Sequence, residues 1–479
     1  MSNVLLNKSF QGVLWTFLDV IINKIGVFVS TLIIARILGP EVYGLVGMIT
    51  VFITIGNSLV DSGMSTSLIR TPSISAKDLS TVFIGALTIS VVVYLVFFLF
   101  APLIASFYKQ PILENVIRVY CLVFIISAFR AVQSSMLIRE LEFKKNTLLT
   151  LPAALLSSVT GIILAKNGYG IWSVVYMFVL QQLILTVLLW GYSNAKIDFS
   201  FSKEIFKRHF SFGYKLTLSG LLNTAFGNLN NVLIGRFYPV AQSGYYERAY
   251  SLNQYPATVF TAIISKVSMP VLSKIQDDKE KVENVLKVLM RYAMLAISFI
   301  MIVMILFSKE IILLILGVEW EPTVPYLQII SLGMIFLPIH MFNMNVLQVY
   351  GKSDLFLKAE LIKKVFQFSC VFILYQFGIL WMVSSLVFLS VFEIFVNSFF
   401  VGKVINLGVK QQVRNIWRIC SFLLVILCSL YILKFYLLTS FSLIVVNVLI
   451  FMLLTGLYLL YIFLFEKDIL NKVIDMVKK

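Results

Sequence analysis

The chain has 479 residues, of which 59% are apolar and only 13% are charged, with a formal net charge of +16. Soluble domains carry roughly 25% charged residues, so this composition excludes a soluble globular protein and indicates an integral membrane protein. Most of the positive charge lies between apolar segments, where it orients the chain and meets anionic lipid, and we therefore expect no nucleic-acid partner.

Apolar segments of membrane-spanning length follow one another along the chain. A helix needs about 20 apolar residues to cross the hydrocarbon core of a bilayer. The sequence therefore predicts an all-α integral membrane protein with about 14 transmembrane helices. The predicted spans are 12–35, 43–68, 79–108, 113–138, 146–166, 169–192, 209–235, 246–273, 284–307, 322–350, 355–377, 379–401, 415–435 and 440–464.

Lys and Arg cluster at every second junction between these spans. The clusters lie at 70–77, 139–145, 196–208, 274–287, 352–364 and 403–418, whereas the intervening junctions hold one basic residue or none. Positively charged loops stay on the cytoplasmic side. The pattern predicts a multi-pass protein with both termini in the cytoplasm, and we expect His209, beside the basic cluster at 196–208, to be solvated.

The chain resembles itself at an offset of 200 residues, as expected for a transporter built from two parallel repeats. The matching pairs are Phe10 and Phe210, Asn23 and Asn223, Ile34 and Ile234, Arg36 and Arg236, and Gly44 and Gly244. We predict two pseudo-twofold-related six-helix lobes plus two C-terminal helices. The predicted domains are an N-terminal lobe at 1–192, a cytoplasmic linker at 193–208, a C-terminal lobe at 209–401, and two extra helices with a cytoplasmic tail at 402–479.

Several charged residues fall inside the predicted spans, where each costs roughly 2.5–3.5 kcal/mol on an insertion scale unless it faces a cavity or a partner. These residues are Asp19, Lys24, Asp61, Arg130, Lys215, Arg248 and Glu393. The first spans of the two lobes also carry polar stripes at helical spacing, which suggests a shared central cavity. The alternative for the asparagines is hydrogen bonding between helices, and for His340 a buried, hydrogen-bonded imidazole.

Basic groups in a central cavity suit an anionic, amphipathic substrate. We predict that the substrate is bound by Lys24, Arg130, Lys215, Arg248, Asn23 and Asn223. Buried ionisable groups are the usual proton or sodium relays of transporters, so Asp19, Asp61 and His340 are the candidates for ion coupling. We expect no catalytic residue, no metal site and no cofactor, because the chain has neither a phosphate-binding loop nor a cluster with metal-ligand spacing.

Two segments carry a family resemblance. The stretch Asn228–Phe237, followed by Gly244–Ala249, resembles the start of the second lobe of Wzx-type flippases, and Ala35–Gly44 resembles the first outer loop of that family. Asp61–Gly63 is similar to the end of its second span. These flippases form the polysaccharide transporter branch of the multidrug/oligosaccharidyl-lipid/polysaccharide superfamily, and the chain is most similar to the colanic acid exporters. Relatives often place Asp in the region of Asn230 and Asn231, so ion coupling there is in doubt.

The resemblance implies that the protein flips an undecaprenyl-pyrophosphate-linked oligosaccharide from the inner to the outer leaflet of the bacterial cytoplasmic membrane, by alternating access through a basic central cavity. Membrane lipids, a polysaccharide polymerase and the chain-length machinery would be its partners. One alternative is a cation-coupled multidrug exporter of the same superfamily, which Asp19 and Asp61 would suit. Another is a membrane polysaccharide polymerase or ligase, but the short outer loops leave little room for a catalytic domain. The glycan structure, the coupling ion, the resting conformation and the oligomeric state do not follow from the sequence.

Overall fold

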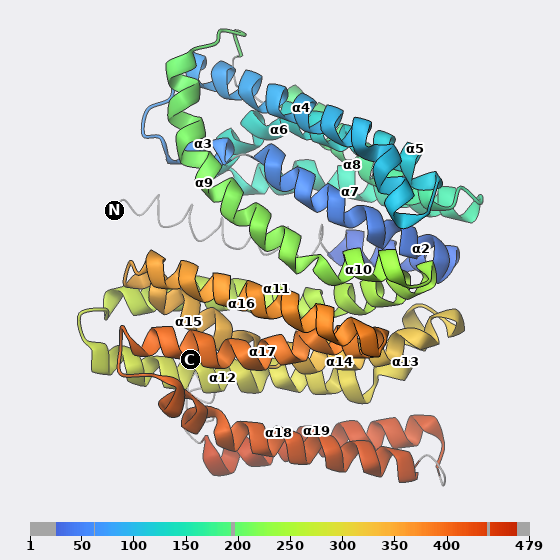
Figure 1. The fold of residues 1–479 in the computed structure, drawn as a ribbon, viewed down its shortest axis with the longest axis vertical. Coiled ribbons are helices and arrows are strands. Elements are labelled where there is room, and N and C mark those ends of the chain that lie inside the picture. Colours follow the sequence, from blue (N-terminus) through green and yellow to red (C-terminus); the bar gives the residue numbers. More distant parts are fainter. Residues whose placement is uncertain (1–24, 62, 193–196, 438–440, 467–479) are drawn as a thin grey trace. The chain divides into compact units, whose positions relative to one another are not determined.

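The computed structural model describes residues 25–61, 63–192, 197–437 and 441–466. Over these residues the chain forms helices and no strand, which confirms the all-α class (Figure 1). Ten helical stretches of the described chain are long and apolar enough to cross a membrane. Three more helices are of spanning length but more polar, namely α9 (Lys203–Gly227), α11 (Val240–Lys274) and α16 (Ser353–Leu374).

The chain divides into two compact units. Unit 1 comprises residues up to Glu247 together with Ile315–Glu319, and unit 2 comprises Arg248–Leu314 together with the chain from Trp320 onward. The boundary falls inside α11 rather than in a loop. The lobe limits expected at 192 and 209 therefore stay a prediction.

Unit 1 is a bundle in which α2 contacts most of the other helices. Its remaining helices are α2 (Gly26–Asp61), α3 (Met64–Arg70), α4 (Ala76–Tyr108), α5 (Ile112–Tyr120), α6 (Leu122–Arg139), α7 (Phe143–Lys166), α8 (Ile171–Tyr192) and α10 (Leu229–Phe237). The long α2 is kinked at Gly39, which has φ of 75° and precedes Pro40. Proline lacks the N–H that a helix interior needs, and glycine tolerates positive φ, so this pair ends one helical segment and starts the next.

Gly44 in α2 and Gly244 in α11 pack reciprocally within unit 1. A Cβ atom on Gly44 would overlap the carbonyl oxygen of Val240, and one on Gly244 would overlap that of Pro40. Position 40 corresponds to 240, and 44 to 244, at the 200-residue offset of the repeat. In a twofold arrangement, two equivalent segments exchange the same contact in this way. The contact therefore supports a pseudo-twofold relation between the segments that begin at Pro40 and Val240.

The chain before α9 is held on the start of α4. The backbone N–H of Asp198 donates to Ser80 Oγ at 2.9 Å, and that of Ser202 donates to Thr81 Oγ1 at 3.2 Å. Hydrogen bonds from the hydroxyls of Ser200 and Ser80 hold the pKa of Asp198 down at about 2. The segment before α9 is thus held on α4 by hydrogen bonds to the hydroxyls of Ser80 and Thr81.

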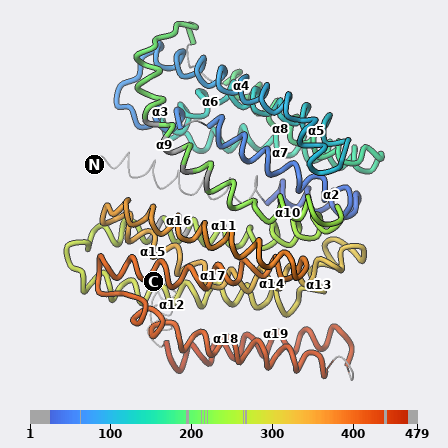
Figure 2. Tube along the Cα trace, viewed as in Figure 1, coloured from blue at the N-terminus to red at the C-terminus, as the bar shows by residue number. Residues whose placement is uncertain are grey.

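The start of α9 lies beside α3 and α4 (Figure 2). Arg208 forms an ion pair with Asp78, the residue that also completes a capping box with Ser75 at the start of α4. His209 is fully buried and its Nδ1 lies 2.8 Å from Ser67 Oγ. The expectation that His209 is solvated was wrong, because α9 begins at Lys203 and its first turns, which include Arg208 and His209, pack against α3 and α4 of the same unit.

Unit 2 contains α16, the part of α11 from Arg248 onward and the remaining helices, around a separate apolar core. These remaining helices are α12 (Lys279–Leu306), α13 (Ser308–Ile315), α14 (Val324–Met334), α15 (Leu337–Val349), α17 (Ile379–Gly402), α18 (Val409–Leu437) and α19 (Leu443–Phe465), with short 3₁₀ turns at Val318–Thr323 and Tyr375–Phe377. The last two helices pair at the edge of the unit, where α18 packs on α12 and α17 (Figure 1).

Two ion pairs attach this helical hairpin to the rest of unit 2. Lys434 Nζ lies 2.8 Å from Glu310 Oε1 and also donates to the carbonyl of Leu306 at 2.6 Å. Arg291 of α12 lies 2.9 Å from Glu466, just beyond α19. Both pairs join buried or half-buried side chains, so the hairpin is anchored by charge as well as by apolar contact.

Candidate functional site

A cavity of about 610 Å³ opens within unit 1. Its volume lies in the range of about 300–1,000 Å³ typical of small-molecule sites. Side chains of α2, α3, α4, α6 and α8 line it. Ten of the lining residues are polar: Asn57, Ser58, Asp61, Ser65, Thr66, Ser127, Arg130, Ser134, Ser135 and Gln182. The cavity is thus rich in hydroxyl and amide groups, with one cation and one anion among its described lining.

One face of α6 supplies much of this lining. Five of the eight lining residues of α6 recur every three or four positions, at Val123, Ser127, Arg130, Ser134 and Ile138. Residues at this spacing lie above one another on one side of a helix. The local sequence of α6 therefore places Arg130 between Ser127 and Ser134 on one face of the helix. These two side chains are small and leave space beside the guanidinium.

Asp61 reaches the cavity from the point where α2 ends. Gly63 separates α2 from α3 with φ of 63°, a left-handed conformation that glycine adopts at little cost. A Cβ at this position would also overlap the backbone of Gly213 in α9. The break explains physically why Asp61–Gly63 has its composition: the carboxylate stands at an exposed helix end, and only glycine fits the turn that follows.

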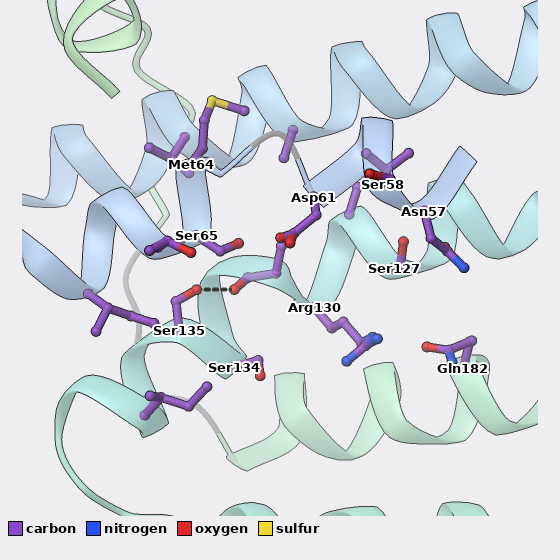
Figure 3. Close-up of a pocket in the computed structure, with 18 of the residues that line it drawn as sticks. Asn57, Ser58, Asp61, Met64, Ser65, Ser127, Arg130, Ser134, Ser135 and Gln182 are labelled. Atoms are coloured by element: carbon purple, nitrogen blue, oxygen red, sulfur yellow. Dashed lines mark hydrogen bonds between the residues drawn. The ribbon is translucent and has the colours of Figure 1, made fainter. Parts of the chain in front are cut away.

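Arg130 is the central charged group of the site. Its Nε and the Oε1 of Gln182 are buried without a hydrogen-bond partner, and Figure 3 shows the guanidinium directed toward Gln182. Asp61 attracts Arg130 electrostatically, yet none of the hydrogen bonds or ion pairs of the described chain joins the two side chains. Buried polar groups are normally satisfied. Arg130 and Gln182, which line the cavity and have polar atoms without a described partner, are therefore candidates for binding a polar ligand.

The structure brings together two of the residues predicted from sequence, Arg130 and Asp61. Asn223 is exposed on α9, and Lys215 belongs to the same helix. Arg248 is buried on α11 and His340 is half-buried on α15, both in unit 2 and outside this cavity. Asp19, Asn23 and Lys24 lie outside the described residues, and so does the side chain of Lys215.

Sequence reasoning missed Gln182, Asn57 and the paired Ser134 and Ser135. For Ser134, four residues after Arg130 on α6, that spacing was the only signal. Asn57 on α2 and Gln182 on α8 are single polar residues of predicted spans and have no pattern of their own. Asn231 was expected on a polar stripe, and its amide donates to Glu247 Oε2 at 3.1 Å. That contact corresponds to the alternative of hydrogen bonding between helices.

A family model described as polysaccharide biosynthesis protein matches residues 33–325, which is more than half of the chain. The protein belongs to this family of polysaccharide biosynthesis proteins. Among curated relatives, the chain is 26% identical over 328 residues to the lipopolysaccharide biosynthesis protein WzxC of Escherichia coli (strain K12), covering 67% of this chain and 66% of WzxC. The chain spans 62 to 68% of the length of the curated relatives it matches. The resemblance predicted from sequence is confirmed.

Two solved structures share the fold of this family member. The inward closed conformation of the lipid II flippase MurJ matches with a TM-score of 0.73 and 17% identity, over 96% of this chain and 100% of MurJ. An inward-facing multidrug resistance MATE family transporter of the MOP superfamily matches with a TM-score of 0.62 and 18% identity, over 82% and 98%. At these identities the likeness shows the fold alone, which is all-α.

Proposed function

We propose that this protein moves an undecaprenyl-pyrophosphate-linked oligosaccharide from the cytoplasmic to the outer leaflet of a bacterial cytoplasmic membrane, for the biosynthesis of a surface polysaccharide. Family membership and the name of the relative WzxC support the substrate class, and the fold of a lipid II flippase suits movement of a lipid-linked headgroup. Translocation makes and breaks no covalent bond, so the protein acts as a transporter rather than an enzyme. Both termini face the cytoplasm, and a polymerase and chain-length machinery receive the exported unit.

The observation that carries the proposal is the guanidinium of Arg130, which has no hydrogen bond or ion pair to the described residues, in a cavity whose other polar lining consists of hydroxyl and amide groups and Asp61. A guanidinium binds phosphate oxygens through charge-assisted hydrogen bonds. Serine, threonine, asparagine and glutamine side chains can donate to and accept from sugar hydroxyls. The cavity therefore offers one group for the pyrophosphate and several for the adjoining sugar.

Asp61 would serve this site in a second way. A carboxylate in the same cavity attracts Arg130 while no substrate is present. A pyrophosphate that enters the cavity competes with Asp61 for the guanidinium. Because the pyrophosphate and the Asp61 carboxylate are both anions, their repulsion favours release of the substrate from the cavity. This arrangement suits a carrier, which must bind its substrate only transiently.

Deletion of the gene tests the function. The lipid-linked oligosaccharide should accumulate on the cytoplasmic face, and purified protein in liposomes should carry that same molecule across the bilayer. Liposomes without protein are the control. Transport of a cationic dye in place of the lipid-linked oligosaccharide would contradict the proposal and support the multidrug exporter alternative. Hydrolysis or elongation of the glycan would support the enzyme alternative.

A further inference from the structure

Unit 2 contains a buried network of ionisable side chains that the substrate cavity does not use. Helices α15, α16 and α17 pack against one another, and each contributes to the network. His340 Nε2 of α15 lies 3.4 Å from Glu393 Oε2 of α17. The other oxygen of Glu393 lies 3.9 Å from Lys363 Nζ of α16, which also contacts Glu360 Oε1 at 2.5 Å. The side chains of His340 and Lys363 are only 12% and 6% exposed.

Glu393 and Lys363 lie near the middle of α17 and α16, and His340 lies three residues after the start of α15, close to where that helix follows α14. Glu393 stands nine residues before the end of α17, His340 nine residues before the end of α15, and Lys363 ten residues after the start of α16. At 1.5 Å per residue, the three residues are about 13–15 Å from the helix ends just named, namely the end of α17, the end of α15 and the start of α16. This depth is close to half of a hydrocarbon core of about 30 Å. Ionisable groups at that depth are a functional feature by default.

The hydrogen bonds around His340 define where its proton sits. Ser390 Oγ lies 3.3 Å from Nε2 but donates its own hydrogen to the carbonyl of Gly333 at 2.7 Å, so it accepts from the imidazole. A carboxylate at Glu393 can also only accept. Nε2 therefore carries the hydrogen of the neutral ring. Nδ1 is then the basic nitrogen, and it is buried without a hydrogen-bond partner.

The charges around the imidazole restrict which cation could bind. Glu393 faces His340 directly, while Lys363 and Glu360 approach from α16. Lys364 interacts electrostatically with Glu360 and Glu393. A sodium ion beside Glu393 would be repelled by the ammonium of Lys363. A proton needs no coordination shell and binds to a single nitrogen, so the network suits a proton and disfavours a metal cation.

The other helices packed on α15 bring their charges elsewhere. In α12, Lys287 pairs with Glu283 at 2.6 Å, and Arg291 pairs with Glu466. From α11, Ser268 accepts a hydrogen bond from Asn345 at 2.6 Å. Glu393 is therefore the carboxylate within ion-pair distance of His340 over the described residues.

We propose that His340 and Glu393 form a proton-binding site in unit 2 that couples proton movement to the translocation proposed above, on which this inference rests. One proton from water adds to Nδ1 of His340, and the imidazolium then holds Glu393 as its counter-ion. When the imidazolium loses this proton, Lys363 is the remaining cation within ion-pair distance of Glu393 over the described residues. The proton thus changes whether α17 is linked more strongly to α15 or to α16, and a change of helix partner is what a transporter needs to couple binding to a conformational step.

Nuclear magnetic resonance of protein labelled with ¹⁵N-histidine tests the site without any transport assay. The chain has only two histidines, and His340→Gln assigns the signals. We expect the Nε2–H tautomer of His340 at alkaline pH and an imidazolium on acidification. A ring that keeps one state over the whole pH range in which the protein remains folded would overturn the proposal, and so would an Nδ1–H tautomer.

Proteoliposomes test the coupling. The membrane potential is clamped at zero, because a potential alone moves a doubly charged substrate. An inward proton gradient should accelerate export of the lipid-linked oligosaccharide severalfold in the wild type. Glu393→Gln and His340→Gln should lose this acceleration yet retain exchange of the oligosaccharide without a gradient. If the wild type shows no exchange of the oligosaccharide at all, the proposed flippase function is refuted. This result differs from one in which the wild type exchanges the oligosaccharide but does not respond to the proton gradient.

Glu310→Gln is the matched control. Glu310 also pairs with a lysine of unit 2, and its side chain is 21% exposed, as is that of Glu393. It should keep the response to the proton gradient. If Glu393→Gln fails to reach the membrane, His340→Gln tests the same site while leaving both ion pairs of Lys363 in place. Retention of the full response by His340→Gln, or a response to sodium instead of protons, would contradict the proposal.

Discussion

The two units differ in the surroundings of their buried polar side chains. In unit 1, a cavity contains hydroxyl and amide groups together with Arg130 and Asp61, which form no ion pair with each other or with another described residue. In unit 2, Lys363, Glu360, Glu393 and His340 contact one another. A charge that faces an open cavity is available to a ligand, whereas charges that satisfy one another keep helices together or exchange a proton. On this comparison we propose that unit 1 contacts the substrate and that unit 2 couples its movement to a proton.

The largest expected effect comes from removing the cation of the unit 2 network. Lys363→Met leaves Glu360 and Glu393 without their lysine, and breaking a buried pair in this way costs about 3–5 kcal/mol. We expect loss of folded protein from the membrane, measured by thermal unfolding in detergent. The double variant Lys363→Met with Glu360→Gln should recover part of the stability. A single variant as stable as the wild type would show that the unit 2 charges are not mutually dependent.

Arg130→Ala should affect transport without this loss of stability, since Arg130 forms no ion pair with any residue that the structure describes. A hydrogen bond to a charged group contributes about 1.5–3 kcal/mol, so binding of the lipid-linked oligosaccharide should weaken by about 10- to 100-fold. Arg130→Lys should retain part of the binding as a point charge. The control is Arg118→Ala, which removes a half-exposed pair with Glu114 in the same unit. Equal transport by Arg130→Ala and Arg118→Ala would remove Arg130 from the site.

Adding volume where the two glycines meet should destabilise unit 1 through its backbone. Gly44→Ala places a methyl group on the carbonyl oxygen of Val240, and overpacking typically costs about 1–3 kcal/mol. Gly244→Ala should behave alike, because its contact with Pro40 is the equivalent one. Thermal unfolding measures both, with Gly26→Ala as a control at a position where no atom lies within 4 Å. Opposite effects at the two glycines would contradict the pseudo-twofold relation.

The smallest expected effect sharpens the picture of the cavity. Gln182→Ala removes an amide that has no partner for its oxygen, and one neutral hydrogen bond contributes about 0.5–1.5 kcal/mol. Binding of the oligosaccharide should weaken about two- to tenfold in a titration. Ser135→Ala should change it little, because the hydroxyl of Ser135 already donates to the carbonyl of Ala131 at 2.7 Å. Equal effects of the two substitutions would show that Gln182 does not contact the ligand.

The amino-acid sequence by itself determined the class of this protein. Apolar length predicts a helix wherever no water can satisfy the backbone, so the all-α membrane fold followed from composition and span length. The cost of a charge in a span likewise identified Arg130, Asp61 and Glu393 as residues that need an explanation, and the place of His340 inside a predicted span identified that residue as a candidate protonatable group. The 200-residue repeat paired Gly44 with Gly244 before any contact was known.

Only the tertiary structure decided which of these residues act together. Lys363 belongs to a basic cluster that the sequence assigned to a cytoplasmic junction, yet it lies buried in α16 between two carboxylates. His209 was expected in solvent and is buried against Ser67. Gln182 had no pattern of its own and faces Arg130. The physical reason is that hydropathy is read along one helix, whereas a polar partner is set by how each helix is rotated about its axis and which neighbours it packs against.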